Sequence, residues 1–307
     1  MPVKTWSTPL VEESAVKVPC ALCGGDRFIP HYRCSAGEEG FFAYARCARC
    51  GLVQINPQPD PRAVARRYGV RGQETESGAD TEAYLNYEIA NEAAFLRLQE
   101  QALSDAGFFE LERELLARAA PNGEKARLLD IGCATGALLS KLAGRGWIAE
   151  GVEISPAQAE HCRKKGLTVS SLPLEENRFP ENSFDAVLAS HLIEHLNNPA
   201  SFVREIFRVL KPLGRCFITT PNIDGLQSKI FGGAWRSAIF DHLYLFSGKT
   251  LRLLLVQAGL PPEKTVTWGG LAAGAGPRRL KKPLDFLAKR FGFGDVMLVR
   301  AVKPPRS

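Results

Sequence analysis

From residue 126 onward, hydrophobic and polar positions alternate between two patterns. Short apolar runs, such as ARLLDIG at 126–132 and FDAVLAS at 184–190, are typical of buried strands. Between them lie amphipathic segments typical of helices. In one of these, SPAQAEHCRKKG, we expect Ser155 to be the N-cap and Pro156 to open the first turn. Strands and helices that alternate in this way predict an α/β fold, a doubly wound parallel sheet with helices on both faces.

The sequence before this region has a different character. The proline-rich run NPQPDP, starting at Asn56, marks a boundary, and helical spacing of apolar residues follows it up to about residue 120. We therefore predict a small ribbon over residues 15–58, a helical cap or linker over 59–120 and a core over 121–304. Three tyrosines of the helical region offer a roof for a pocket, although core packing is the favoured interpretation: Tyr68, Tyr84 and Tyr87.

Five of the eight cysteines fall in the first fifty residues. Four of them form two Cys-x-x-Cys pairs, CALCGG and CARCGL, each followed directly by glycine. Two thiolates at this spacing can turn toward one ion, and four leave no position open for water. We predict a structural zinc site, and the alternative is a set of buried or redox-active thiols. The predicted ligands are Cys20, Cys23, Cys47 and Cys50, with Cys34 as a spare.

The net charge is 39 − 33 = +6 and is concentrated in one segment. Between Pro277 and Phe291, six basic residues face Asp285 alone, which gives 6 − 1 = +5. This distribution argues against a nucleic-acid surface over the whole body. It allows one local contact through 277–291, with an anionic membrane surface or a diphosphate-bearing substrate, or simply a solvated charged helix. No apolar run approaches the roughly 18 residues of a spanning helix, so we expect a cytoplasmic protein.

The first strand of the predicted core ends in a glycine-rich turn, LLDIGCATG. A dinucleotide fingerprint has glycines at spacing 0, 2 and 5, whereas Gly132 and Gly136 stand at 0 and 4. Asp130 would repel a pyrophosphate but attract an ammonium and a sulfonium. Glu153 follows 23 residues after Asp130 and can accept both hydroxyls of a ribose. The turn therefore favours S-adenosylmethionine over a nicotinamide dinucleotide.

Three segments carry a resemblance to a known family: LLDIGCATGALL, VEISPAQ and FPENSFDAVLASHLIEHLNNP. They resemble the class I S-adenosylmethionine-dependent methyltransferases, in the ubiquinone-biosynthesis-like branch. With the cysteine pairs, TTPN and DHLYLFS, the order resembles bacterial methyltransferases that carry an N-terminal zinc ribbon, many of which modify sugars or surface glycans. The resemblance implies a Rossmann-like core, the cofactor S-adenosylmethionine and a small-molecule or glycan acceptor.

The same resemblance implies individual roles. Asp130, Gly132, Cys133 and Gly136 would line the methionine side of the cofactor. Glu153 would hold the ribose and Ile154 would pack on the adenine, while Ser190 and His191 would face the sulfonium and the acceptor. The residue that contacts the adenine amino group is unassigned, with Ser171 as one candidate.

A hydroxyl acceptor needs a base, for which histidine is suited near neutral pH. His191 lies at the end of a predicted strand, and His242 lies among aromatic residues in FDHLYLF. We predict both as catalytic candidates, with a structural role as the alternative for His242 and the favoured role for His195. The predicted function is O-methylation of a sugar, a glycan precursor or a related metabolite. The alternatives are an rRNA or tRNA methyltransferase and a non-catalytic module of the same fold.

Overall fold

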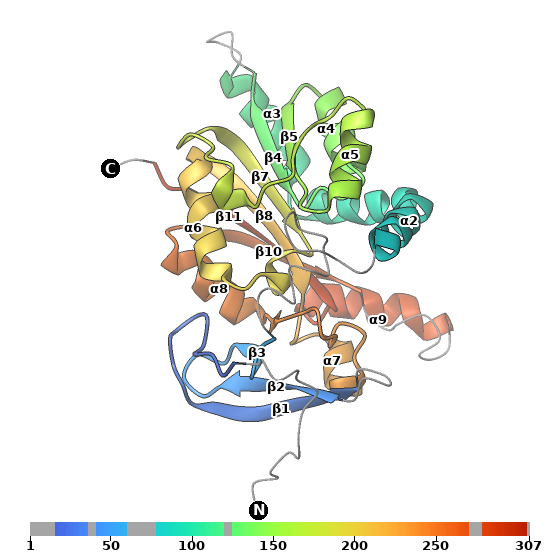
Figure 1. The fold of residues 1–307 in the computed structure, drawn as a ribbon, viewed down its shortest axis with the longest axis vertical. Helices are drawn as coiled ribbons and strands as arrows, with labels where there is room; N and C mark the ends of the chain where they lie inside the picture. Colours follow the sequence, from blue (N-terminus) through green and yellow to red (C-terminus); the bar gives the residue numbers. More distant parts are fainter. Residues whose placement is uncertain (1–15, 36–40, 60–77, 120–124, 270–277, 306–307) are drawn as a thin grey trace, which may run out of the picture.

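The computed structural model describes residues 16–35, 41–59, 78–119, 125–269 and 278–305. These residues form a seven-stranded sheet covered by helices and a four-stranded sheet packed at one end of it (Figure 1). None of the described helices combines the length and the apolarity that crossing a membrane requires.

The seven-stranded sheet has the order β10-β11-β8-β7-β4-β5-β6. Five strands are parallel, as predicted, and they are β4 (Arg127–Ile131), β5 (Ile148–Val152), β6 (Thr168–Ser170), β7 (Phe184–Ser190) and β8 (Leu210–Pro221). The sheet is not parallel throughout, because β11 (Val296–Val302) runs antiparallel between β8 and β10 (Pro262–Trp268). A strand buried on both faces reads as a continuous apolar run in either direction, so the sequence of β11 carries no sign of its reversal.

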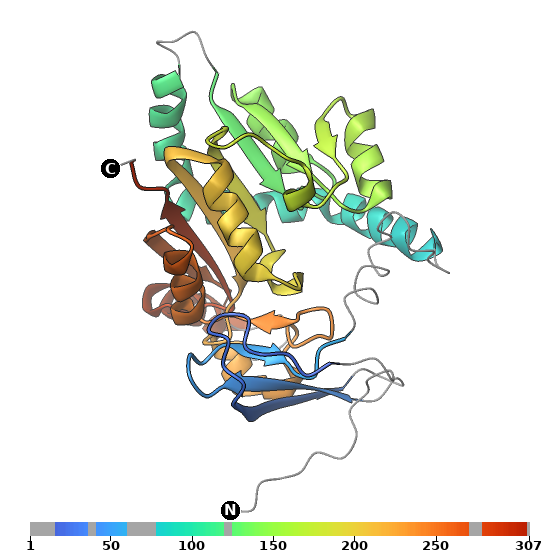
Figure 2. The same ribbon diagram turned by 60° about the vertical axis from the view of Figure 1, so that its left-hand side comes forward.

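Helices cover both faces of this sheet (Figure 2). Consecutive strand residues point to opposite faces, so Leu128 and Leu129 belong to two different hydrophobic clusters. One cluster packs under α2 (Gly78–Asp105), α3 (Phe108–Ala119), α4 (Ala137–Gly144) and α5 (Pro156–Lys164). The other packs under α6 (Pro199–Val209) and α8 (Gly248–Gln257) and extends into the four-stranded sheet. The predicted doubly wound α/β arrangement is therefore confirmed, with the mixed edge as its one departure.

The four-stranded sheet joins the amino-terminal segment to a distant part of the chain. It consists of β1 (Phe28–Ser35), β2 (Phe41–Cys47), β3 (Val53–Ile55) and β9 (Tyr244–Leu245). Val53 pairs with Leu245, and the Tyr44 hydroxyl lies 2.8 and 2.7 Å from the carbonyl oxygens of Ile239 and His242. The segment predicted as a separate ribbon thus completes its sheet with a strand from the segment predicted as the core.

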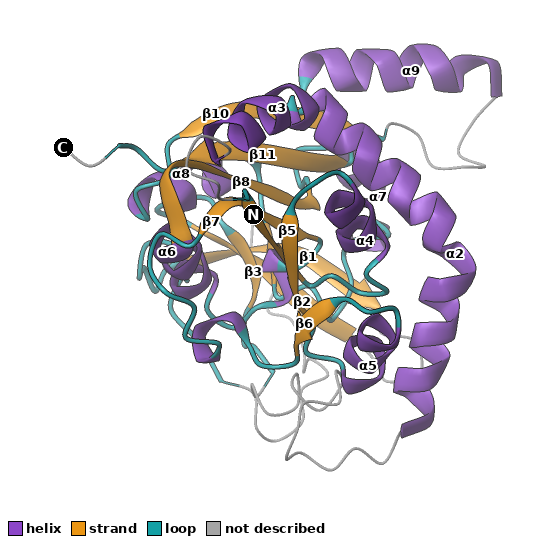
Figure 3. Cartoon of the chain, turned by 90° about the horizontal axis from the view of Figure 1, so that it is seen from above, coloured by secondary structure: helices purple, strands orange, loops and turns teal. Residues whose placement is uncertain are grey.

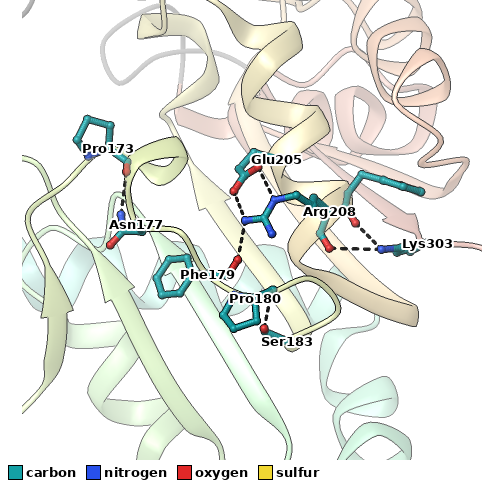
Figure 4. A network of polar contacts seen from close by, with 9 residues as sticks. Pro173, Asn177, Phe179, Pro180, Ser183, Glu205, Arg208 and Lys303 are labelled. Carbon is teal, nitrogen blue, oxygen red and sulfur yellow. Dashed lines mark hydrogen bonds and ion pairs between the residues drawn. The ribbon is translucent and has the colours of Figure 1, made fainter.

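The remaining elements connect the strands at the rims of the sheet. A short 3-10 helix, η3 (Leu174–Glu176), follows β6, and Arg208 on α6 fixes the chain after it by donating 2.6 Å to the Phe179 carbonyl while pairing with Glu205 (Figure 4). The helix α7 (Leu226–Phe231) and the 3-10 helix η5 (Gly232–Ala234) follow β8, and α9 (Arg278–Phe291) lies at the periphery of the molecule (Figure 3). Residues 60–77, which include Tyr68, lie outside the described part of the chain.

Candidate active site

The turn between β4 and α4 adopts a backbone that glycine favours. Gly132 has φ +73° and Gly136 has φ +74°, and Ala134 between them takes φ +48° despite its side chain. A Cβ atom on Gly136 would also lie 2.5 Å from Leu167 and 3.0 Å from the Cys162 thiol. Gly136 is therefore required both for its backbone angle and for the space between the turn and Leu167.

Glu153, just beyond the end of β5, braces this turn. Its Oε2 accepts a hydrogen bond of 3.0 Å from the Ala134 amide, and its Oε1 accepts one of 2.9 Å from the Ser155 amide. Ser155 occupies the N-cap position of α5, as predicted, but its side chain makes no capping bond. Each carboxylate oxygen has a second lone pair, so Glu153 can hold the turn and still accept ribose hydroxyls.

Two buried carboxylates stand next to each other at this edge of the sheet. Burial, and then the charge of Glu153, raise the pKa of Asp130 to about 7. Burial also raises the pKa of Glu153, although the amides of Ser155 and Ala134 oppose the shift. Among the residues that the structure describes, no cationic side chain forms an ion pair with either carboxylate, and negative charge of this kind favours a cationic ligand. A ligand with an ammonium and a sulfonium therefore fits these residues better than a pyrophosphate does.

The other predicted cofactor residues lie around the same edge. Ile154 follows Glu153 and Ser190 ends β7, and both are half-buried. Leu192 packs against Gly132, so the end of β7 adjoins the glycine turn. The Cys133 thiol points away from the edge, because a Cβ on Gly151 of β5 would lie only 2.7 Å from its sulfur. Only the main chain of Cys133 can therefore contribute to the predicted methionine pocket.

The helix α2 lies against the turn. Lys165 donates 2.9 Å to Glu92 on α2 and 3.1 Å to the Thr135 carbonyl in the turn. Tyr84 and Tyr87 are both more than half exposed. Core packing is therefore the wrong interpretation for these two tyrosines, because the half of α2 that carries them projects past the sheet (Figure 3).

His191 occupies a strained position directly after β7. Its φ is +51°, in the left-handed region that residues other than glycine rarely adopt. Its backbone amide donates a hydrogen bond of 2.9 Å to the Thr219 carbonyl. The imidazole of His191 is exposed at this edge of the sheet, and its Nδ1 atom lies 3.3 Å from the carboxylate of Glu194. Glu194 is fully buried and accepts 2.9 Å from the Thr220 hydroxyl.

The neighbouring histidines favour the ionised form of Glu194. Burial alone would raise its pKa, but His191, followed by His195 and His242, brings the pKa down to about 2. The carboxylate is therefore ionised at every physiological pH and can orient an imidazole and stabilise its protonated form.

His242, the second catalytic candidate, has a different environment. It is buried, and its Nδ1 donates 2.8 Å to the Ser237 carbonyl. Burial lowers its pKa to about 4, against the opposing charge of Glu194. These contacts match the structural alternative for His242, whereas His191 presents its ring to the exterior.

Donor atoms of Glu194, His195 and His242 lie within 4.8 Å of one another. The Nδ1 atoms of the two histidines bond backbone carbonyls, His195 to Asp241 at 2.9 Å. We assign no metal to these three residues.

The four predicted thiol ligands come together at the amino-terminal sheet. Cys20 and Cys50 lie 3.4 Å apart, Cys23 and Cys47 lie 3.5 Å apart, and all four sulfurs fall within 4.8 Å of one another. A tetrahedral ion with metal–sulfur bonds of about 2.3 Å needs sulfurs roughly 3.8 Å apart. The set therefore has the spacing of a tetrathiolate site.

Comparison with known families identifies the class of protein. Residues 104–264, just over half of the chain, match the family described as "Methyltransferase domain". The chain belongs to this family, and its core has a Rossmann-like sheet in which parallel strands alternate with helices.

Individual relatives are O-methyltransferases by name. The chain is 36% identical over 107 residues to the ubiquinone biosynthesis O-methyltransferase of Methylococcus capsulatus, a match that covers 33% of this chain and 44% of the relative. It is 35% identical over 136 residues to the protein of the same name from Caulobacter vibrioides, covering 42% and 50%. The chain thus spans about half the length of the curated relatives it matches.

Solved structures of similar proteins include two methyltransferases. The S-adenosylmethionine-dependent methyltransferase of Thermotoga maritima has 22% identity and a TM-score of 0.47, over 68% of this chain and 96% of that one. The one from Archaeoglobus fulgidus has 22% identity and a TM-score of 0.44, over 63% and 94%.

Two features of the site could not be predicted from the sequence. The i,i+3 spacing of His191 and Glu194 was visible in the sequence, but the left-handed backbone of His191 that accompanies their contact was not. The bridge from Lys165 to Glu92 joins residues 73 positions apart and has no local signal.

Proposed function

We propose that this methyltransferase transfers a methyl group to a hydroxyl of a small molecule, with His191 as the general base. The observation that carries the proposal is the pairing of an exposed imidazole with the buried carboxylate of Glu194, directly after β7. An imidazole held this way can take a proton from a hydroxyl as the new bond forms. The names of the curated relatives support oxygen as the methylated atom.

In this proposal, each group of residues at the carboxyl ends of the strands has its own role. Asp130 and the main chain of 132–136 bind the cationic end of the cofactor, and Glu153 binds its ribose. S-adenosylmethionine supplies a methyl group on a neutral leaving group, so alignment of the acceptor contributes much of the rate enhancement. Glu194 positions His191 and stabilises the proton that His191 accepts. The left-handed backbone at residue 191 fixes the direction from which the base approaches.

We propose a sugar, a glycan precursor or a related metabolite as the acceptor. The support is the order of the ribbon, the core and the TTPN and DHLYLFS segments, which resembles sugar-modifying methyltransferases. RNA is the second candidate. The charge distribution disfavours it, since +5 of the net +6 lies in the segment 277–291.

The acceptor class is tested by transfer of labelled methyl groups from S-adenosylmethionine into an extract of the source cells. The extract is then divided by solvent partition, acid precipitation and nuclease treatment. Label in a nuclease-resistant small-molecule, lipid or glycan fraction supports the proposal, whereas label that disappears with ribonuclease overturns it in favour of RNA.

The base is tested by a pair of substitutions. His191→Ala should lower kcat by about 10²- to 10⁴-fold while leaving the Kd for S-adenosylmethionine unchanged. His242→Gln, the matched control, keeps a side-chain donor for the Ser237 carbonyl and should retain most of the turnover. Wild-type turnover in His191→Ala, or loss of turnover in His242→Gln alone, would assign the base to another residue.

We also propose that Cys20, Cys23, Cys47 and Cys50 bind a structural zinc ion. The spacing of the four sulfurs supports this. Two tight turns support it as well: the Gly24 amide donates 2.8 Å to the Cys20 carbonyl, and the Gly51 amide donates 3.0 Å to the Cys47 carbonyl. Four thiolates complete a tetrahedral shell, so the ion would organise the chain and take no part in the transfer.

A further inference from the structure

The helix α9 contacts the body near its carboxyl end. Ala288 is buried, and its carbonyl accepts 2.8 Å from the Phe293 amide and 3.4 Å from the Thr267 hydroxyl. Lys289 pairs with Asp105 of α2 at 2.5 Å. From this attachment the helix extends along the outside of the molecule (Figures 1 and 3).

Large apolar side chains of α9 point away from the body. Phe286 is 68% exposed and Phe291 is 62% exposed, and Leu287 is also exposed. At about 100° per residue, Phe286, Leu287 and Phe291 span an arc of about 140° around the helix. Ala288, which is buried and is the only such residue among the described side chains of the helix, lies outside this arc, about 60° beyond Phe291. The exposed apolar side chains therefore lie on an arc of α9 that does not include the buried residue.

The end of α7 continues this apolar surface. The Leu226 amide donates 2.9 Å to the Phe293 carbonyl, and the Lys229 ammonium lies 4.6 Å from the centre of the Phe293 ring. Ile230 is 55% exposed, and Phe293 is exposed as well. We call this surface the α7–α9 face, made of Lys229, Ile230, Phe286, Leu287, Phe291 and Phe293.

The charge of the segment complements an anionic partner. Six basic residues fall between positions 278 and 290 with Asp285 as the single acid, and Lys229 adds a further charge from α7. Lys289 is engaged with Asp105, and the other basic residues of the segment remain in excess over acids. Aromatic and aliphatic side chains among lysines and arginines match the interface of an anionic bilayer, where rings enter the headgroup region and cations meet lipid phosphates.

We propose that the α7–α9 face docks this protein on anionic membrane surfaces, with α9 lying in the plane of the interface. A soluble diphosphate would meet the cations but leave four exposed apolar side chains of α9 and its extension without a partner. A bilayer accounts for both. The proposal concerns binding alone and holds whatever acceptor the methyltransferase uses.

The test is co-sedimentation of the full-length protein with two kinds of vesicle. One contains phosphatidylcholine only, and the other contains about one third phosphatidylglycerol. We expect binding to the anionic vesicles, weakened by salt, and little binding to the neutral ones. Phe286→Ser with Phe291→Ser should lower the partition coefficient at least about tenfold, since each ring contributes roughly a factor of ten or more when buried.

Matched controls separate docking from general effects. Leu172→Ser with Val256→Ser removes two exposed apolar side chains elsewhere and should bind like wild type. Lys281→Gln with Lys282→Gln should weaken binding to anionic vesicles, whereas Lys125→Gln with Lys249→Gln, the same charge change outside the segment, should not. Thermal unfolding of each variant checks that it is folded.

Three outcomes would overturn the proposal. The first is no binding to anionic vesicles by the wild-type protein. The second is unchanged binding in the double phenylalanine variant. The third is release of the protein by inorganic pyrophosphate far beyond its release by chloride at equal ionic strength. That last result would assign the segment to a soluble phosphate-bearing ligand.

Discussion

We expect Asp130 to make the affinity for S-adenosylmethionine depend on pH. Its raised pKa, about 7, means that about 9% of the side chain is ionised at pH 6 and about 91% at pH 8. A cationic ligand binds the ionised form. The apparent Kd should therefore fall about tenfold from pH 6 to pH 8, which corresponds to about 1.4 kcal/mol, and binding at pH 6 should release nearly one proton.

Asp130→Asn isolates this effect, because the cofactor's amino group and Glu153 titrate in both proteins. Isothermal titration calorimetry at pH 6, 7 and 8, in two buffers of different ionisation enthalpy, gives the Kd and the number of protons released. We expect the variant to bind more weakly at pH 8 and to lose the tenfold trend. Parallel plots of log Kd against pH for the two proteins would refute the argument.

The raised pKa of Asp130 also makes the free energy of unfolding depend on pH. The unfolded chain loses the Asp130 proton near pH 3.8 and the folded chain near 7, so folding without cofactor becomes less favourable as pH rises from about 4 to 7. Asp130→Asn removes that loss. Its free energy of unfolding, measured with urea, should therefore exceed that of the wild type increasingly up to pH 7 and by a constant amount above it.

Three further predictions follow from contacts of the turn and the thiols. Chelation of the metal, or Cys47→Ser, should destabilise the amino-terminal sheet first, seen as hydrogen exchange at 41–55, and purified protein without zinc would contradict the assignment. Gly136→Ala should cost about 2–5 kcal/mol of unfolding free energy, since it combines a left-handed backbone with a clash against Leu167, and a loss under about 1 kcal/mol would contradict this. Lys165→Ala should weaken cofactor binding with less than about 1 kcal/mol lost in urea unfolding, because its two contacts are partly solvated, and unchanged affinity would show that the link to α2 has no part in binding.

Much of the central sheet could be predicted because its signals are local. The apolar run of β4, the glycines after it and the capping box that Ser247 forms at the start of α8 are all determined by neighbours in sequence. The four clustered thiols were equally predictable, since their spacing is what a tetrahedral ion requires. These features depend on few long-range contacts.

The rest depended on tertiary contacts. Nothing in the apolar sequence of β11 shows that it runs against β8, because burial on both faces hides direction. His242 was predicted as a catalytic candidate from its aromatic neighbours in the sequence, whereas its burial and its hydrogen bond to the Ser237 carbonyl depend on the fold. Glu194 gains its importance from three imidazoles, one of which, His242, is 48 positions away, and only the fold brings them together.

The pairing of β3 with β9 has a consequence for how the chain is made. Val53 and Leu245 are 192 positions apart, so the ribosome synthesises the thiol-bearing segment long before the strand that completes its sheet. During that interval the edge of β3 is open, with buried residues such as Tyr44 lacking the carbonyls of Ile239 and His242. An ion captured by the thiols at this stage would hold the nascent segment in shape until its partner emerges. An early metal supply would then govern the yield of folded enzyme more than its rate of turnover.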